Sequence, residues 1–315
     1  MIPRRLDRLT PLPLDKKPEV PTHPGYHAAG ARDRPDTIFS AEFQRRLRRH
    51  IARHLVLYET TSRPPRFLCI QGNPGEGKTE TVQVVCSRDG VDVIIVAAAE
   101  LAGATENAGV EALERLSEAV RLISQQHRRP LLVLFDDFDL SSVARLAATE
   151  YTVNSQLLTQ YFQFIADTGA LRTADGLSAP IVMTGNDFTP MRSSLLRPGR
   201  ADFFSFAPSF DEKVAIVAAL LAIPDRTAVR PLVWEHRHEP IAFFSALKTS
   251  LSDQTLDAVI AKHGLDVPAI QNVLTDTSQR PADLAHLRAL ALRAANAGAV
   301  PQNFLTTARV SCPGK

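Results

Sequence analysis

Short apolar runs alternate along the middle of the chain with longer stretches that have the spacing of amphipathic helices. The apolar runs that we interpret as strands lie at 67–70, 93–97, 131–135, 180–184 and 203–206. Helices are predicted between them, at about 110–127 and 153–168. Uninterrupted apolar strands separated by helices are typical of a parallel sheet that helices cover on both faces. The pattern therefore predicts an α/β domain.

The pattern changes after Pro208, where the strand signals stop. Segments near 211–221, 240–250, 253–263 and 281–296 have helical spacing instead. We therefore predict an α/β domain over 37–208, a small all-α lid domain over 209–300 and a tail over 301–315. Residues 1–36 are rich in proline and mixed in charge, which favours a flexible, extended arm rather than a folded unit.

An amphipathic helix is expected within 38–58, and it has one face rich in arginine. The arginines of this face are Arg45, Arg46, Arg48, Arg49 and Arg53. A solvated helix face and a surface for phosphate or for an acidic partner are both compatible with this pattern. The choice between them needs the tertiary structure.

Composition narrows the class of protein. Of the 315 residues, 44% are apolar and 22% are charged, and 36 basic against 34 acidic residues leave a net charge of +2. This balance creates no global field toward nucleic acid or anionic lipid, so we expect neither a nucleic acid nor a membrane as partner. The cysteines Cys69, Cys86 and Cys312 lack metal-site spacing and are interpreted as reduced thiols, two of them buried. We expect a cytoplasmic protein.

The motif that narrows the function most is Gly-x-x-x-x-Gly-Lys-Thr at 72–79, the P-loop pattern. It follows an apolar strand and opens a helical stretch, so backbone N–H groups and a helix dipole would converge on a phosphate. Lys78 is expected to reach the β- and γ-phosphates of ATP, and the Thr79 hydroxyl to ligate Mg²⁺. The residues predicted to bind the nucleotide are Gly72, Asn73, Pro74, Gly75, Glu76, Gly77, Lys78, Thr79 and Glu80.

A second part of the same site is predicted where the apolar run 131–135 ends in Asp136 and Asp137. A carboxylate at the end of a buried strand beside the P-loop can hold Mg²⁺, which we assign to Asp136. A neighbouring carboxylate can orient or deprotonate the attacking water, which we assign to Asp137. Asp139 is the next candidate for that base.

Two further polar segments point to a known superfamily. Asn186 ends the apolar run 181–185, and Leu-Leu-Arg-Pro-Gly-Arg follows at 195–200. Together with the P-loop, these segments resemble the AAA+ ATPases. The resemblance implies that Asn186 polarises the attacking water, and that Arg197 and Arg200 reach the γ-phosphate bound by a neighbouring subunit.

Within that superfamily the chain resembles Rubisco activase over about 38–297. The similar segments are 151–156, 164–167, 181–188, 207–208 and 241–247. The resemblance implies a ring-shaped homo-oligomer, expected to be a hexamer, which uses ATP hydrolysis to remodel a partner protein that the sequence does not identify. It also places Lys248 at the sensor-2 position, where the family has arginine. The pair Asp136-Asp137 departs from the Asn-Asp of activases.

A loop over 98–109 is expected to line the centre of such a ring. It carries small and acidic residues and no aromatic residue, which favours limited pulling on a segment; an ordinary surface loop is the alternative. Two other functions stay open at this point. One is a nucleotide-controlled scaffold that hydrolyses slowly, and the other is a DNA-associated loader supported only by the arginine-rich helix.

Overall fold

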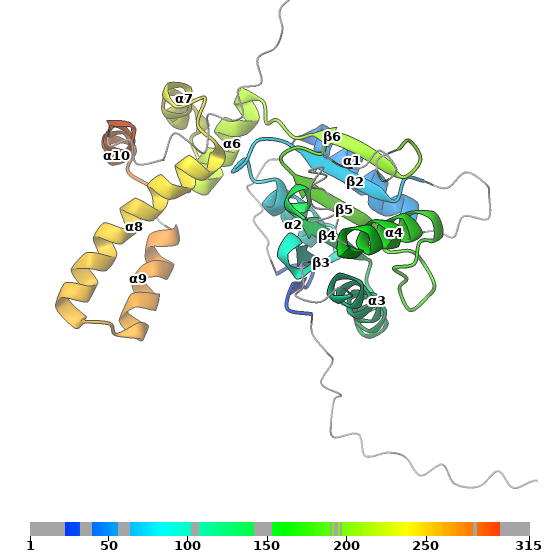
Figure 1. Cartoon of the computed structure of the whole chain (residues 1–315). Helices are drawn as coiled ribbons and strands as arrows, with labels where there is room; N and C mark the ends of the chain where they lie inside the picture. Colours follow the sequence, from blue (N-terminus) through cyan, green and yellow to red (C-terminus); the bar gives the residue numbers. More distant parts are fainter. Residues whose placement is uncertain are drawn as a thin grey trace, which may run out of the picture.

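A six-stranded sheet forms the centre of the α/β domain, with the strand order β1-β3-β4-β5-β2-β6. All neighbours pair in parallel except β1, which runs antiparallel to β3. The computed structural model in Figure 1 describes residues 23–31, 40–55, 64–101, 107–141, 153–189, 191, 195, 197–279 and 282–296. The strands are β1 (Tyr26–His27), β2 (Phe67–Gln71), β3 (Asp92–Ala97), β4 (Leu131–Asp136), β5 (Ile181–Gly185) and β6 (Ala201–Ser205).

Helices cover both faces of this sheet. On one face lie α3 (Ala108–His127) and α4 (Val153–Thr168), and on the other α1 (Ala41–His54) and α2 (Lys78–Arg88). Alternate residues of β2 point to opposite faces: Phe67 joins the α3/α4 core, and Leu68 joins the α1/α2 core. The predicted parallel sheet between two helical layers is confirmed.

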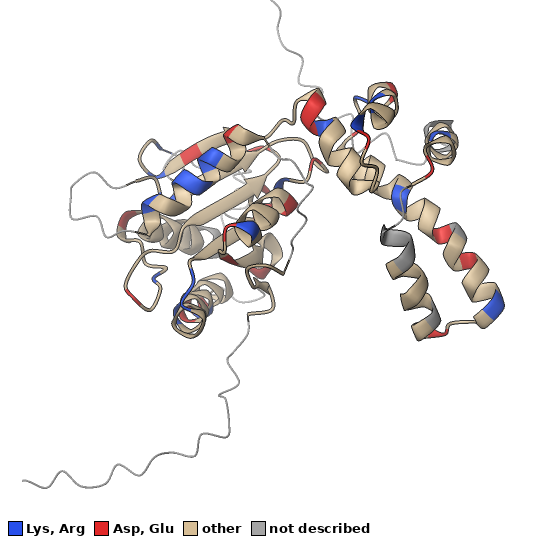
Figure 2. Ribbon diagram, turned by 180° about the vertical axis from the view of Figure 1, so that it is seen from behind, with Lys and Arg blue, Asp and Glu red and all other residues tan. Residues whose placement is uncertain are grey.

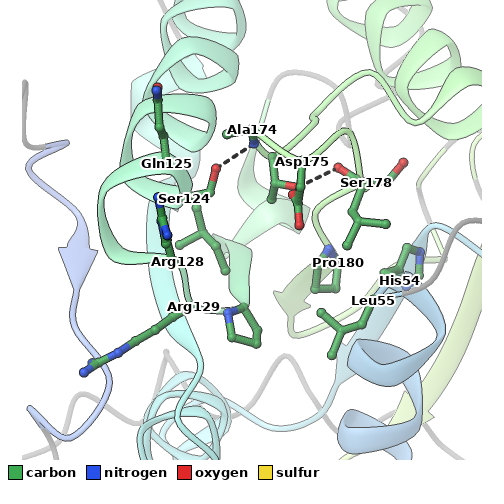
Figure 3. Close-up of a pocket in the computed structure, with 14 residues that line it drawn as sticks. His54, Leu55, Ser124, Gln125, Arg128, Arg129, Ala174, Asp175, Ser178 and Pro180 are labelled. Carbon is green, nitrogen blue, oxygen red and sulfur yellow. Dashed lines mark hydrogen bonds between the residues drawn. The ribbon is translucent and has the colours of Figure 1, made fainter.

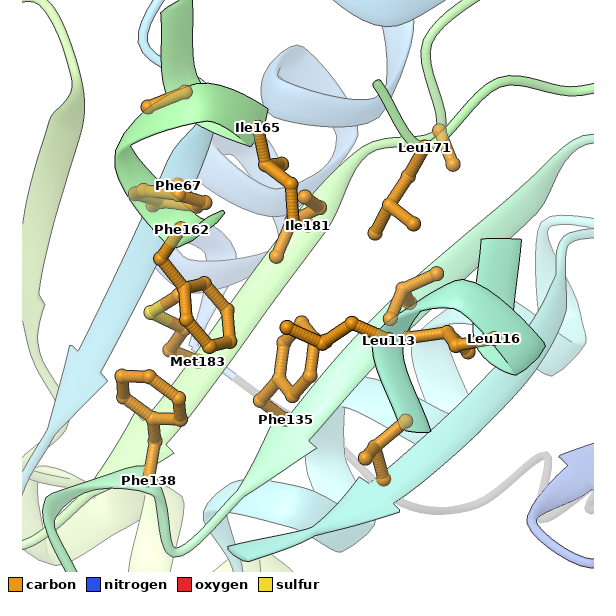
Figure 4. Packing of buried hydrophobic residues seen from close by; sticks show 14 of the residues in the cluster. Phe67, Leu113, Leu116, Phe135, Phe138, Phe162, Ile165, Leu171, Ile181 and Met183 are labelled. Atoms are coloured by element: carbon orange, nitrogen blue, oxygen red, sulfur yellow. The ribbon is translucent and has the colours of Figure 1, made fainter. Parts of the chain in front are cut away.

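Aromatic rings and aliphatic side chains together fill the α3/α4 side of the sheet (Figure 4). The ring of Phe162 from α4 lies edge-on to Phe135 at the end of β4 and to Phe138 just beyond it, with centroids 5.2 and 5.0 Å apart. All three side chains are buried. This packing holds the carboxyl end of β4, where the candidate carboxylates lie, against a rigid layer.

The segment 23–31 lies within the predicted arm but is part of the α/β fold. Tyr26 pairs with Ile94, and the Tyr26 hydroxyl donates to Asp92 Oδ2 at 3.0 Å. A Cβ on Gly25 would lie 1.9 Å from the carbonyl oxygen of Ile95, so only glycine permits this approach. The arm prediction is therefore wrong for 23–31, because polar contacts and a backbone ladder replace the apolar pattern that would have indicated a strand. The rest of the arm and the tail lie outside the described residues.

The C-terminal region is helical, as predicted, with a core shared by α6, α7, α8 and α10. The helices and their bounds are α6 (Phe210–Leu220), α7 (Arg226–Glu235), α8 (Ile241–His263), α9 (Val267–Gln279) and α10 (Leu284–Asn296). The sequence patterning missed α7 and α9. It also divided α8 into two helices, which is wrong. Thr249 and Ser252 hydroxyls donate back to the carbonyls of Ser245 and Lys248, so these residues do not break the helix.

The arginine-rich face belongs to α1, whose ribbon is blue at several basic positions in Figure 2. Arg45 and Arg46 both pair with Glu42, and Arg46 also lies 3.3 Å from Asp202. Arg48 donates to both oxygens of Asp89 at 2.7 and 2.8 Å. Carboxylates of the same chain thus offset much of the positive charge of this face, which weakens the case for a DNA-binding helix.

Over the described residues, none of the helices combines the length and the apolarity that a bilayer crossing requires.

Candidate nucleotide-binding site

The P-loop leaves the carboxyl end of β2 and closes onto the first turn of α2, as its motif requires. Gly75 and Gly77 have φ of 75° and 81°, a conformation that side-chain-bearing residues rarely adopt. A Cβ on Gly72 would lie 2.3 Å from the Phe206 carbonyl oxygen. Gly77 is the N-cap of α2 and supplies no side-chain cap, so the first amides of α2 are available to an anion. Glu80 lies in that first turn.

Lys78 is held at the centre of the loop. Its Nζ donates to the carbonyls of Gly72 and Asn73 at 2.8 and 3.0 Å and to Asn186 Oδ1 at 3.0 Å. Burial lowers the pKa of Lys78, while nearby carboxylates, Asp137 foremost, act to raise it. The structure therefore brings the predicted phosphate lysine and the predicted water-polarising asparagine into contact, although they lie far apart in the sequence.

Thr79 and Asp136 also meet. The Thr79 hydroxyl donates to Asp136 Oδ1 in a very short contact, and the same oxygen accepts from the Thr184 hydroxyl at 2.6 Å. Thr184 was missed by sequence reasoning. Its position follows from the parallel pairing of Phe135 with Met183, which sets the next residues of β4 and β5 side by side. The only signal in the sequence is a hydroxyl two residues before Asn186.

Asp137 and Asp139 lie just beyond β4. Asp137 has a φ of 49°, and burial together with the Asp136 and Asp139 carboxylates raises its pKa. Asp139 Oδ2 accepts from the backbone amides of Asn186 and Asp187 at 3.0 and 3.4 Å. Asp139 therefore positions the loop after β5, whereas Asp137 is free of that task.

The donor set fits MgATP. Hydroxyl and carboxylate oxygens from Thr79 and Asp136 converge beside a loop of open amides, and Mg²⁺ in nucleotide sites takes one or two protein oxygens together with phosphates and water. Thr79 and Asp136 are the residues that would hold the ion. When bound there, Mg²⁺ would neutralise negative charge on the phosphates.

The two arginines of the 195–200 segment differ in their surroundings. Arg197 has a side chain that is 60% exposed and lies 4.0 Å from Asp167. Arg200 is 10% exposed, and its Nε and Nη2 donate to the two oxygens of Asp167 at 2.8 and 2.5 Å. The structure thus leaves most of the Arg197 side chain exposed and pairs the Arg200 guanidinium with Asp167 of the same chain. The role in trans predicted for Arg200 does not suit this placement, because a bidentate pair with Asp167 occupies its guanidinium.

Lys248, predicted at the sensor-2 position, is the eighth residue of α8. Its Nζ donates to the Leu220 carbonyl at 2.6 Å, at the C-terminal end of α6. The beginning of α8 is what contacts the P-loop, because Ala242 N donates to Gly75 O at 2.9 Å. The hydrogen bond from Lys248 to Leu220 therefore joins α8 to the end of α6 within the lid. The contact with the P-loop is made by the backbone of Ala242 instead.

The predicted ring-lining loop is described only in part. Its centre, 102–106, lies outside the described residues, while Ala98–Leu101 forms a 3-10 helix.

A hollow of about 600 Å³ lies at the amino ends of β4 and β5 (Figure 3), whereas the P-loop follows the carboxyl end of β2. Its lining includes Arg128, Asp175 and His54.

Comparison with known proteins agrees with this geometry. Residues 68–209 match the family described as "ATPase family associated with various cellular activities (AAA)". The chain contains an AAA ATPase domain. The matched stretch includes the P-loop from Gly72, the carboxylates after β4, Asn186 and both arginines.

Curated relatives are similar over a longer stretch. A chloroplastic ribulose bisphosphate carboxylase/oxygenase activase from Phaseolus vulgaris is 28% identical over 251 residues, 74% of this chain and 54% of that protein. An activase from Anabaena is 30% identical over 214 residues, 65% of this chain and 51% of that protein. Activase B from Hordeum vulgare is 26% identical over 227 residues, 69% of this chain and 52% of that protein. The AAA ATPase domain thus lies in a chain that spans about half the length of the curated relatives it matches.

Proposed function

We propose that the chain is an ATPase that binds MgATP at the P-loop, hydrolyses it between subunits of a homo-oligomeric ring and uses the reaction to remodel a partner protein. The observation that carries the nucleotide site is the contact of Lys78 Nζ with Asn186 Oδ1 beside the Thr79–Asp136 contact. The AAA ATPase domain supports hydrolysis. Similarity to Rubisco activases supports a ring, expected to be a hexamer, and a protein substrate. A cytoplasmic location stays a prediction.

The geometry supports the following roles within this proposal. The P-loop amides and Lys78 hold the phosphates, and Asn186 and Asp137 orient a water for attack in line with the leaving group. The pKa of Asp137 is raised by burial, which makes its carboxylate a better proton acceptor. Arg197, whose side chain is 60% exposed, is the residue we assign to a neighbouring subunit's γ-phosphate.

Nucleotide titration of Lys78→Ala tests this proposal, with Lys262→Ala as the matched control. Lys78 makes its contacts inside the P-loop, whereas Lys262 is exposed near the C-terminal end of α8. We expect Lys78→Ala to lose ATP binding and hydrolysis while Lys262→Ala keeps both. ATP affinity in Lys78→Ala equal to that of the parent would refute the assignment of the site.

A further inference from the structure

Glu76 is a carboxylate inside the loop that would cradle phosphate. Its side chain is 12% exposed, and within the described part of the chain its Oε2 is buried and accepts no hydrogen bond. A negative charge in this position opposes the binding of another anion, since like charges a few ångström apart repel strongly where water is excluded. Glu76 therefore needs a compensating charge for the loop to bind a nucleotide.

Lys213 supplies that charge from the lid. It belongs to α6, which begins after a capping box formed by Ser209 and Glu212. Its side chain is 9% exposed, and its Nζ lies 3.8 Å from Glu76 Oε1. A buried ammonium at this distance from a buried carboxylate offsets its charge far more than an exposed pair would.

The same ammonium holds the beginning of α8. Lys213 Nζ donates to the carbonyls of Arg237 and Glu239, the latter in a very short contact. These carbonyls belong to the turn between α7 and α8, and the Ala242 amide at the beginning of α8 donates to the Gly75 carbonyl of the P-loop. One side chain thus connects α6, the turn before α8 and the P-loop. Displacing the lid would separate Lys213 from Glu76.

We propose that Lys213 is the lid cation of the nucleotide site: it neutralises Glu76 within the P-loop and thereby makes phosphate binding depend on the docked position of the lid. The role assigned by resemblance to Lys248 passes to Lys213, because Lys248 Nζ is engaged with the Leu220 carbonyl. This inference rests on the proposed function, since it supposes that the P-loop binds ATP. Lys213 is a positioning residue that acts through Glu76.

The test is a double-mutant cycle with Lys213→Met and Glu76→Gln, read by titration of fluorescent ATP, ADP and adenosine analogues. Lys213→Met leaves Glu76 uncompensated and should weaken ATP binding by roughly tenfold, ADP less and adenosine little, because Coulomb repulsion grows with the charge of the ligand. Glu76→Gln should bind ATP at least as tightly as the parent. The double variant should recover to within about threefold of the parent, because the charge to be neutralised is gone.

Controls separate this inference from a structural role and from failure of the proposed function. Lys262→Met, at an exposed position of α8, should bind all three ligands like the parent. Lys213→Arg keeps the charge and should retain most of the affinity. A double variant as weak as Lys213→Met, or an equal loss for ATP and adenosine, would overturn the inference. If Lys213→Met does not fold, a tenfold loss of ATP affinity in Glu76→Gln would overturn it instead. A parent chain that binds no ATP would refute the proposed function itself.

Discussion

Replacing Arg200 by alanine is expected to destabilise the α/β domain. Arg200 Nε and Nη2 donate to the two oxygens of Asp167, which lies near the C-terminal end of α4. The arginine side chain is 10% exposed and the aspartate 52% exposed. The pair therefore fastens the last turn of α4 to the segment that leads into β6.

The magnitude follows from these two exposures. A hydrogen bond to a charged group contributes about 1.5–3 kcal/mol when it is shielded from water. Asp167 is half exposed, so water competes for it and the gain falls toward the value of a surface pair. For the two bonds together we expect a loss of about 2 kcal/mol in the free energy of unfolding. In a domain of this size that loss lowers the melting temperature by roughly 4–8 °C.

Thermal unfolding of Arg200→Ala, Asp167→Ala and the double variant measures the pair, because coupled residues give less than additive losses. Arg121→Ala is the matched control, since Arg121 donates to both oxygens of Glu118 on the surface of α3 with both side chains about half exposed. Its effect should stay within about 0.5 kcal/mol. If Arg200→Ala melts with the parent and loses only hydrolysis, the reasoning is refuted and Arg200 acts as the finger after all.

Three other predictions follow from the described contacts. Arg197→Ala should bind ATP normally and hydrolyse it about 10³-fold or more slowly; mixing it with inactive Lys78→Ala subunits should restore part of the activity, and no recovery despite subunit exchange would contradict action across a subunit boundary. Asp137→Asn should keep ATP bound while turnover falls about 10²–10⁴-fold; turnover at the parent rate would place the base elsewhere. Burial lowers the pKa of His54 from 6.5 to about 4. As the pH falls from about 6.5 to 4, the imidazole is therefore protonated in the unfolded chain before it is protonated in the folded one, and the free energy of unfolding decreases by up to roughly 3 kcal/mol. His54→Phe should flatten that loss in urea unfolding at pH 7 and pH 5, and an unchanged difference between the two pH values would rule out His54 as its source.

Local chemistry alone determined the α/β domain and the centre of its site. Short apolar runs such as 131–135, separated by helical stretches, are typical of parallel strands buried on both faces. The glycines of the P-loop permit positive φ where a turn into α2 requires it, and they place Lys78 and Thr79 at a helix N-terminus. These features depend on residues close together in the sequence, so their pattern could be interpreted without the fold.

Tertiary structure decided the features that depend on distant partners. The sequence predicted neither the pairing of Tyr26 with β3 nor the contact of Thr184 with Asp136, 48 residues away. The separate environments of Arg197 and Arg200 arise because α4 brings Asp167 to one guanidinium more closely than to the other. The reason is physical: strand register and helix docking decide which distant side chains meet, and the spacing of two residues along the chain does not by itself give the distance between them in the fold. The lid shows this most clearly, since its contact with the P-loop through α8 is accompanied by the approach of Lys213 on α6 to within 3.8 Å of the Glu76 carboxylate.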